Sequence, residues 1–138
     1  MSTIVRHPSG PKLSDAVEYN GVCYLAGMVA SDETLDTKGQ TEQVLADIDR
    51  ALALCGTNKS KILSATCYIS DMRNKPGMDE AWLAWVDPNN LPSRATVQVG
   101  LGNPTTLIEI MVIAAKQSPR GATRVRRRRY PRCGLSSG

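Results

Sequence analysis

The segment that most constrains the fold of this chain runs from residue 91 to residue 116, LPSRATVQVGLGNPTTLIEIMVIAAK. Val97, Val99 and Leu101 alternate with polar or small residues, which is the period-2 pattern of a half-buried strand. Residues 102–104, Gly-Asn-Pro, supply turn chemistry, and an apolar run follows them. The segment therefore predicts two strands joined as a hairpin.

The apolar run after the turn, LIEIMVIAA, contains a single polar side chain, that of Glu109. A carboxylate in such a strand costs free energy unless it is hydrogen-bonded or paired. Arg94, near the start of the preceding strand, is a candidate partner. An arginine and a glutamate inside otherwise apolar strands predict a site for a small anionic substrate.

The expected register of this hairpin assigns its side chains to faces. If the hairpin closes symmetrically on the turn at residues 102–105, Gln98 lies opposite Glu109. Glu109 then shares one face with three residues of the first strand: Arg94, Thr96 and Gln98. The other face, predicted to point into the core, carries Ala95, Val97, Val99 and Leu101. The same register leaves Arg94 roughly 13 Å along the sheet from Glu109, so direct pairing needs a long arginine reach, a bulge or a neighbouring subunit.

The charge of the chain is divided between a body and a tail. Residues 1–119 hold ten lysines and arginines against thirteen acids, a net charge of −3, whereas residues 120–138 hold seven arginines and no acid. We expect one folded domain over residues 1–118 and a basic, disordered tail over residues 119–138. The tail is a polyanion-binding segment, a solvated extension without a role, or an artefact of the reading frame.

Several classes of protein are disfavoured by what the sequence lacks. No apolar run approaches the ~20 residues of a membrane span, and the start, MSTIVRHPSG, lacks the apolar stretch of a signal peptide, so we expect a cytoplasmic protein that does not enter the membrane. Four cysteines show no CxxC spacing, and His7 is the single histidine. This pattern argues against a zinc site.

The order of predicted elements defines the fold class. Strands are expected at residues 3–6, 16–19, 22–27 and 62–70 before the final pair, and helices at residues 39–55 and 76–86. This order, β-β-β-α-β-α-β-β, predicts an α+β domain with one mostly antiparallel sheet and two helices on a single face. The other sheet face would be apolar and uncovered, which favours self-association into a closed cyclic oligomer.

The chain resembles a known family in several segments: PSRATVQVGL with LIEIMVIA, VCYLAG, and TEQVLADIDRALALCGTNKSKILSATCYISD. These are similar to the Rid family, the reactive intermediate deaminases also called the YjgF family, over about residues 2–117. The segments TIVRH, AWLAWV and QVGLGNP are most similar to its YoaB-like subgroup. The resemblance implies a chorismate-mutase-like α+β fold and a homotrimer with clefts between subunits. It also implies hydrolysis of reactive 2-enamines and 2-imines to 2-keto acids and ammonia, without a cofactor.

The resemblance also assigns roles to residues of the final segment. The family's arginine falls on Arg94, which would clamp the substrate carboxylate. The backbone N–H of Thr96 would donate to the substrate, and Glu109 would hold the attacking water and transfer a proton.

Other positions are candidates for the substrate cleft or depart from the family pattern. Ala26 stands where the best-known deaminases have a serine, and Lys12 or Leu13 stands in place of a tyrosine. Tyr24 and Trp85 are further candidates for the cleft wall, although aromatic residues in such segments more often serve the core or an interface.

Two other functions compete with imine hydrolysis. Some relatives have been described as endoribonucleases or translation inhibitors; the charge of −3 on the body argues against RNA binding there, so nucleic acid would bind only through the basic tail. The third hypothesis is a non-catalytic binder of small carboxylate metabolites, such as keto acids, in which Arg94 captures the carboxylate without turnover.

Overall fold

The computed structural model describes residues 3–116, and the predicted tail at 119–138 lies outside them. The strands are β1 (Val5–Ser9), β2 (Leu13–Tyr19), β3 (Val22–Leu25), β4 (Met28–Val29), β5 (Ile62–Ile69), β6 (Ser93–Gln98) and β7 (Ile108–Ala115). The α-helices are α1 (Thr37–Leu54) and α2 (Lys75–Trp85), and the short 3₁₀ turns are η1 (Lys59–Lys61) and η2 (Met72–Asn74).

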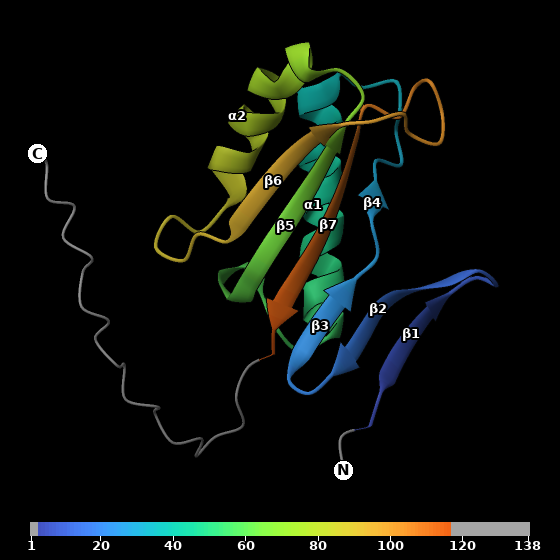
Figure 1. Ribbon diagram of the computed structural model, residues 1–138, viewed down its shortest axis with the longest axis vertical. Helices are drawn as coiled ribbons and strands as arrows, with labels where there is room; N and C mark the ends of the chain where they lie inside the picture. Colours follow the sequence, from blue (N-terminus) through green and yellow to red (C-terminus); the bar gives the residue numbers. More distant parts are fainter. Residues whose placement is uncertain (1–2, 117–138) are drawn as a thin grey trace, which may run out of the picture.

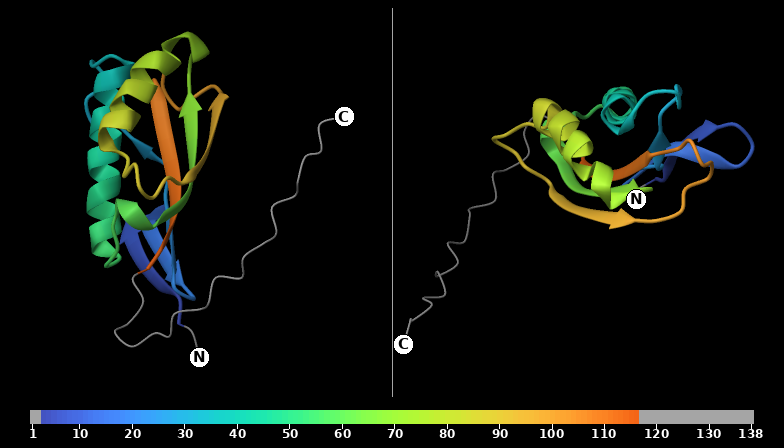
Figure 2. Two further views of the ribbon diagram at one scale, coloured as in Figure 1. Left: turned by 90° about the vertical axis from the view of Figure 1, so that its left-hand side faces the viewer. Right: turned by 90° about the horizontal axis from the view of Figure 1, so that it is seen from above.

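The strands form one sheet in the order β1-β2-β3-β7-β5-β6, with β4 also pairing with β7 (Figure 1). Every pair is antiparallel except β5 and β6, which are parallel and are connected through α2. A helical crossover is the usual connection between parallel neighbours. Both helices cover the same face of the sheet (Figure 2), so the predicted α+β class, one mostly antiparallel sheet with two helices on one face, is confirmed.

Local sequence signals account for most element boundaries. The Asn20–Gly21 turn joins β2 to β3 with φ angles of 49° and 74°, as an Asn-Gly hairpin turn requires. Helix α1 begins after Asp36, whose carboxylate accepts a hydrogen bond from the backbone N–H of Gly39 at 2.8 Å. The helix is followed by Gly56, which adopts a φ of 71°.

The predicted hairpin between the last two strands is wrong. Strand β5 lies between them, and Tyr68 of β5 pairs with Val97 of β6 on one side and with Glu109 of β7 on the other. Residues 99–107 connect β6 to β7 and pass around the end of β5, where the N–H of Val99 donates to Ile69 and the N–H of Ser70 donates to Leu107. A connection of this length joins strands that are not neighbours, whereas tight hairpins use two to five residues.

This topology reverses the predicted faces of β6. Arg94 pairs with Ala65 and Thr96 pairs with Cys67, and both partners on β5 are buried beneath the helices. Because directly paired residues point to the same face, Arg94 and Thr96 face the helices. Val97, which was predicted to face the core, lies on the opposite face and is 39% exposed.

The sheet face away from the helices is apolar and uncovered within the chain. The large hydrophobic residues exposed on this open face include Tyr24, Val29, Val97 and Met111. Figure 2 shows neither helix on this side of the sheet. Within residues 3–116, neither helix has both the length and the apolar character that crossing a membrane requires.

Candidate functional site

Arg94 is held beneath α2 at the outer edge of the sheet. Its guanidinium group donates a hydrogen bond to Asp79 of α2 at 2.8 Å and lies 5.2 Å from the centroid of the Trp82 ring. The other carboxylate oxygen of Asp79 accepts from the ammonium group of Lys75 at 2.6 Å. The Arg94 side chain is only 22% exposed, so these contacts fix its orientation.

The charges of this group do not cancel. Burial alone would raise the pKa of the Asp79 carboxyl, but the hydrogen bonds from Lys75 and Arg94 outweigh burial and lower the pKa below its ordinary value. Asp79 is therefore ionised at neutral pH and stands between two cations. The three side chains carry a net charge of +1, so they can accept one further anion.

A pocket of about 360 Å³ adjoins the arginine. It is lined by Asp79, Trp82, Leu83, Val86, Leu91, Pro92 and Arg94. Its walls are mainly apolar, with the arginine and one carboxylate as the charged groups. Such a lining suits a small molecule that carries a carboxylate and a short side chain.

Thr96 contributes a backbone donor at the free edge of β6. The N–H of Val99 points toward β5, and alternate residues along a strand direct their N–H groups to the same side. The N–H of Thr96 therefore points to the unpaired edge, since β6 is the last strand of the sheet. The hydroxyl of Thr96 is buried and has no hydrogen-bond partner among the described residues.

Glu109 lies on the open face of the sheet, next to Gly27. It pairs across the sheet with Tyr68 and with Val29, and it is half-buried. A Cβ atom on Gly27 would lie 2.6 Å from the Oε2 atom of Glu109, so the glycine leaves room for the carboxylate. Within residues 3–116, no hydrogen-bond or ion-pair partner is found for the carboxylate of Glu109.

Arg94 and Glu109 do not pair within one chain. Arg94 points to the helix face and Glu109 to the open face, and their strands are separated by β5. The partner of Arg94 is Asp79 instead. The chain therefore presents two half-sites, one on each face of the sheet, and a single copy cannot bring them together.

The remaining predicted residues are divided between these regions. Ala26 immediately precedes Gly27 and donates its N–H to the carbonyl of Asp15 at 2.9 Å, so it belongs to the Glu109 half-site. Tyr24 is 46% exposed on the open face. Leu13, at the start of β2, is also exposed, as is its neighbour Lys12.

Trp85 lies away from the pocket at Arg94. Its indole N–H donates to Asp49 of α1 at 2.9 Å, and the ammonium group of Lys59 lies 5.4 Å from its ring centroid. Trp82, one turn earlier on α2, lines the pocket instead. Sequence reasoning missed Asp79 and Lys75, because their i,i+4 spacing on α2 gives no sign of the strand that they face.

Comparison with known proteins supports the architecture and gives the family. The family model described as "Endoribonuclease L-PSP" matches residues 5–116. A RutC family protein of Haemophilus ducreyi is 45% identical over 104 residues, which cover 75% of this chain and 89% of that protein. The RutC family protein YoaB of Escherichia coli is 42% identical over 113 residues, which cover 82% of this chain and 98% of that protein.

Solved structures agree with this assignment. A member of the YjgF protein family from Neisseria meningitidis superposes with a TM-score of 0.81 at 38% identity, covering 85% of this chain and 98% of that chain. A candidate translation initiation inhibitor from Salmonella typhimurium superposes with a TM-score of 0.76 at 40% identity, covering 82% of this chain and 97% of that chain. The fold and the sequence together define a two-helix, single-sheet protein of the YjgF type. The chain belongs to the YjgF/Rid family, and its similarity to YoaB places it near the YoaB-like members.

Proposed function

We propose that the protein hydrolyses reactive 2-imines and 2-enamines to 2-keto acids and ammonia. The observation that carries this proposal is the arginine at the pocket, held by Asp79 and Trp82 with a net positive charge around it. The guanidinium group of Arg94 would bind the substrate carboxylate, and the free backbone N–H of Thr96 would donate a second hydrogen bond.

Glu109 would supply the proton transfers. Its carboxylate would accept a proton from water as the water oxygen bonds to the electrophilic imine carbon, which gives a carbinolamine. From the protonated imine, the carboxyl group would then return this proton to the carbinolamine nitrogen; as the carbon–nitrogen bond breaks, the hydroxyl proton would pass to the carboxylate, and ammonia would leave with the keto acid behind. An enamine would enter the same sequence after protonation at carbon.

The two half-sites would meet between copies of the chain. Because Arg94 and Glu109 lie on opposite faces of one sheet, a complete site needs Glu109 from a neighbouring copy. The apolar open face offers the surface on which copies would associate, and a closed homotrimer would bury it. Catalysis would then depend on assembly. A cytoplasmic location, expected from the sequence, suits an enzyme that acts on metabolic intermediates.

A coupled assay tests the activity. An amino-acid oxidase generates the imine, and its hydrolysis is followed with the wild type, Arg94→Ala and Glu109→Ala, without added metal. We expect the wild type to accelerate hydrolysis and both variants to lose the acceleration. Arg73→Ala is the matched control, since that arginine pairs with Asp71 on the surface and its side chain is 89% exposed.

Mixing the two inactive variants tests the shared site. If each site takes Arg94 from one copy and Glu109 from another, random assembly of equal amounts restores about a quarter of the sites. If both residues act within one chain, the mixture stays inactive. Absence of turnover by a correctly assembled wild type on several imines would refute the deaminase proposal.

A non-catalytic binder of carboxylate metabolites is the second candidate, and the same pocket and net charge favour it. It predicts that keto acids bind without turnover and that Arg94→Ala weakens their binding. No feature of residues 3–116 favours nucleic-acid binding. Such binding would depend on the arginines of residues 120–138. Deleting that segment separates this activity from those of the body.

A further inference from the structure

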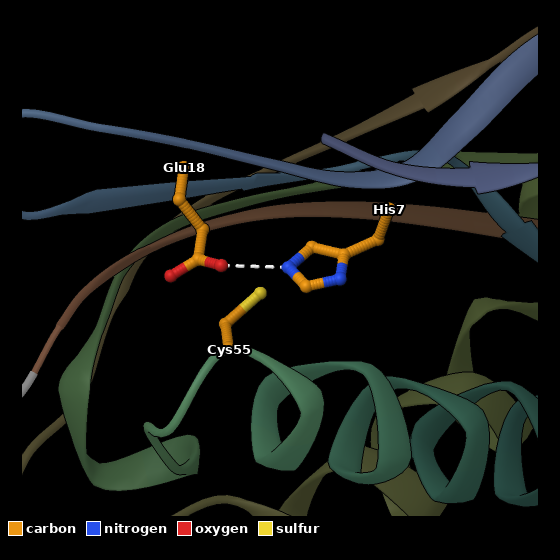
Figure 3. A group of neighbouring side chains, drawn as sticks. All are labelled: His7, Glu18 and Cys55. Carbon is orange, nitrogen blue, oxygen red and sulfur yellow. Dashed lines mark hydrogen bonds and ion pairs between the residues drawn. The ribbon is translucent and has the colours of Figure 1, made fainter. Parts of the chain in front are cut away.

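A cluster of metal-ligating side chains lies at the opposite end of the sheet from the pocket, between the first strands and the end of α1. His7 comes from β1, Glu18 from β2, and Cys55 from the C-terminal cap of α1 (Figure 3). One ligand atom from each lies within 4.8 Å of the others, and the Nε2 atom of His7 is 2.6 Å from the Oε2 atom of Glu18. The three side chains converge although they are far apart in the sequence.

A second thiol adjoins the same cluster. Cys23 of β3 pairs directly with Glu18 in the sheet, so both side chains point toward α1. Both cysteines are buried and free, and burial together with the neighbouring Cys23 thiol raises the pKa of Cys55. We call His7, Glu18, Cys23 and Cys55 the four-donor cluster.

We propose that the four-donor cluster binds one zinc ion. One imidazole nitrogen, one carboxylate oxygen and two thiolates form a donor set that zinc prefers, and four ligands match its tetrahedral coordination. The donor atoms of a tetrahedral zinc site lie about 3.3–3.8 Å apart, from bonds of roughly 2.0–2.3 Å. The donor atoms of His7, Glu18 and Cys55, which already lie within 4.8 Å of one another, would draw together around the ion, and the Cys23 thiol would close the fourth position.

The charges around the cluster fit a divalent ion. Zinc with two thiolates and the carboxylate of Glu18 carries a net charge of −1, which the ammonium group of Lys116 cancels. That ammonium group lies 2.5 Å from the Oε1 atom of Glu18, so the Oε2 atom, which now faces His7, is the one available to the metal. Lys116 would then act as an outer partner that orients a ligand.

The alternative is a structural network without metal. The hydrogen bonds from Lys116 and His7 lower the pKa of Glu18, so the carboxylate is satisfied in the metal-free chain. Burial raises the pKa of Cys55 to about 12, so zinc must displace a proton from each thiol, as it does at other thiolate sites. A network of this kind accounts for Glu18 and leaves Cys23 and Cys55 as buried core residues, so the test is whether these thiols take up a metal ion.

Cobalt titration of the full chain tests the proposal. Cys133, in the segment outside the described residues, is first replaced by serine, and the protein is stripped of metal under reducing conditions. We expect one cobalt ion per chain, with a thiolate-to-metal charge-transfer band that zinc abolishes by displacement. Cys55→Ser and Cys23→Ser should weaken the band, and Cys67→Ser, which changes another buried thiol on β5, should leave it intact.

Two further measurements keep the result independent of folding defects. Lys116→Gln should weaken zinc affinity by about 10- to 100-fold while cobalt keeps its thiolate band. In the chain that keeps Cys23, Cys55 and Cys67, zinc should slow the alkylation of Cys23 and Cys55 and leave the alkylation rate of Cys67 unchanged. Absence of a thiolate band, a band of unchanged intensity in Cys55→Ser, or unchanged alkylation of both cluster thiols would overturn the proposal in favour of the ion-pair network.

Discussion

The buried hydroxyl of Thr96 leads to a quantitative prediction about the edge strand. This hydroxyl has no hydrogen-bond partner among the described residues, and its register partner, Cys67, offers only a thiol, which is a weak hydrogen-bonding group. Burying a hydroxyl without a partner costs about 1–3 kcal/mol. Replacing it with a methyl group in Thr96→Val removes that cost and adds apolar burial of about 0.8 kcal/mol.

We expect Thr96→Val to raise the free energy of unfolding by about 1–2 kcal/mol. This is the lower part of the cost of a buried unpaired hydroxyl, because the Cys67 thiol offers the Thr96 hydroxyl some interaction. For a chain of this length this corresponds to about 3–8 °C in Tm. The assay is urea unfolding and thermal unfolding followed by circular dichroism. Protein concentration is kept fixed, since association would shift the Tm.

Thr57→Val is the matched control, with the opposite expected sign. The Thr57 hydroxyl is also buried, but it donates to the carbonyl of Ala115 at 2.6 Å, so its loss should destabilise the chain by about 1 kcal/mol. Imine hydrolysis by Thr96→Val should stay near the wild-type rate if only the backbone N–H of Thr96 contacts the substrate. Destabilisation by Thr96→Val, comparable to that of Thr57→Val, would refute the reasoning.

Three other predictions address the charged groups. Gly27→Ala should displace the carboxylate of Glu109 and reduce the rate of imine hydrolysis about tenfold or more. The unfolding midpoint should stay close to that of the wild type, because the clash involves the end of a flexible side chain. Unchanged kinetics would contradict the role of Glu109. The pKa of Glu18 is lowered in the folded state. The stability that the Glu18 carboxylate contributes is therefore present above its unfolded pKa of about 4.3 and is lost as pH falls through the folded value. Urea midpoints measured from about pH 6 to pH 3 should fall more for the wild type than for Glu18→Gln. Asp79→Asn should leave the Arg94 side chain less well oriented and raise KM about two- to fivefold with little change in kcat, measured by steady-state kinetics. An unchanged KM would show that Asp79 does not orient Arg94 for substrate binding.

The sequence predicted the local elements well for physical reasons. The Asn20–Gly21 turn, the stop at Gly56 and the helical spacing within residues 39–55 are signals that act over a few residues, and each gave an element close to the observed one. The fold class followed from the order of these elements. Family membership, also predicted, rests on similarity along most of the chain.

The error in the last two strands came from treating neighbours in sequence as neighbours in the sheet. The turn residues at 102–104 favoured a hairpin, but the order β5-α2-β6 already indicated a crossover that sets β6 beside β5 in parallel. That crossover sets β6 beside β5 but is compatible with β7 on either side of the pair, so only the pairing of β7 with β5 in the structure places β5 in the middle. The same error assigned Arg94 and Glu109 to one face.

The sequence alone therefore determined which segments form helices and most strands and which family they belong to, and it drew attention to Arg94 and Glu109 as candidates for a site. The tertiary structure alone decided how those residues meet. Asp79 reaches Arg94 because α2 crosses above β6, and His7, Glu18 and Cys55 converge from three separate elements. Periodicity and turn chemistry report on neighbours along the chain, whereas the face of a strand and the partner of a charge depend on which strands pair in space.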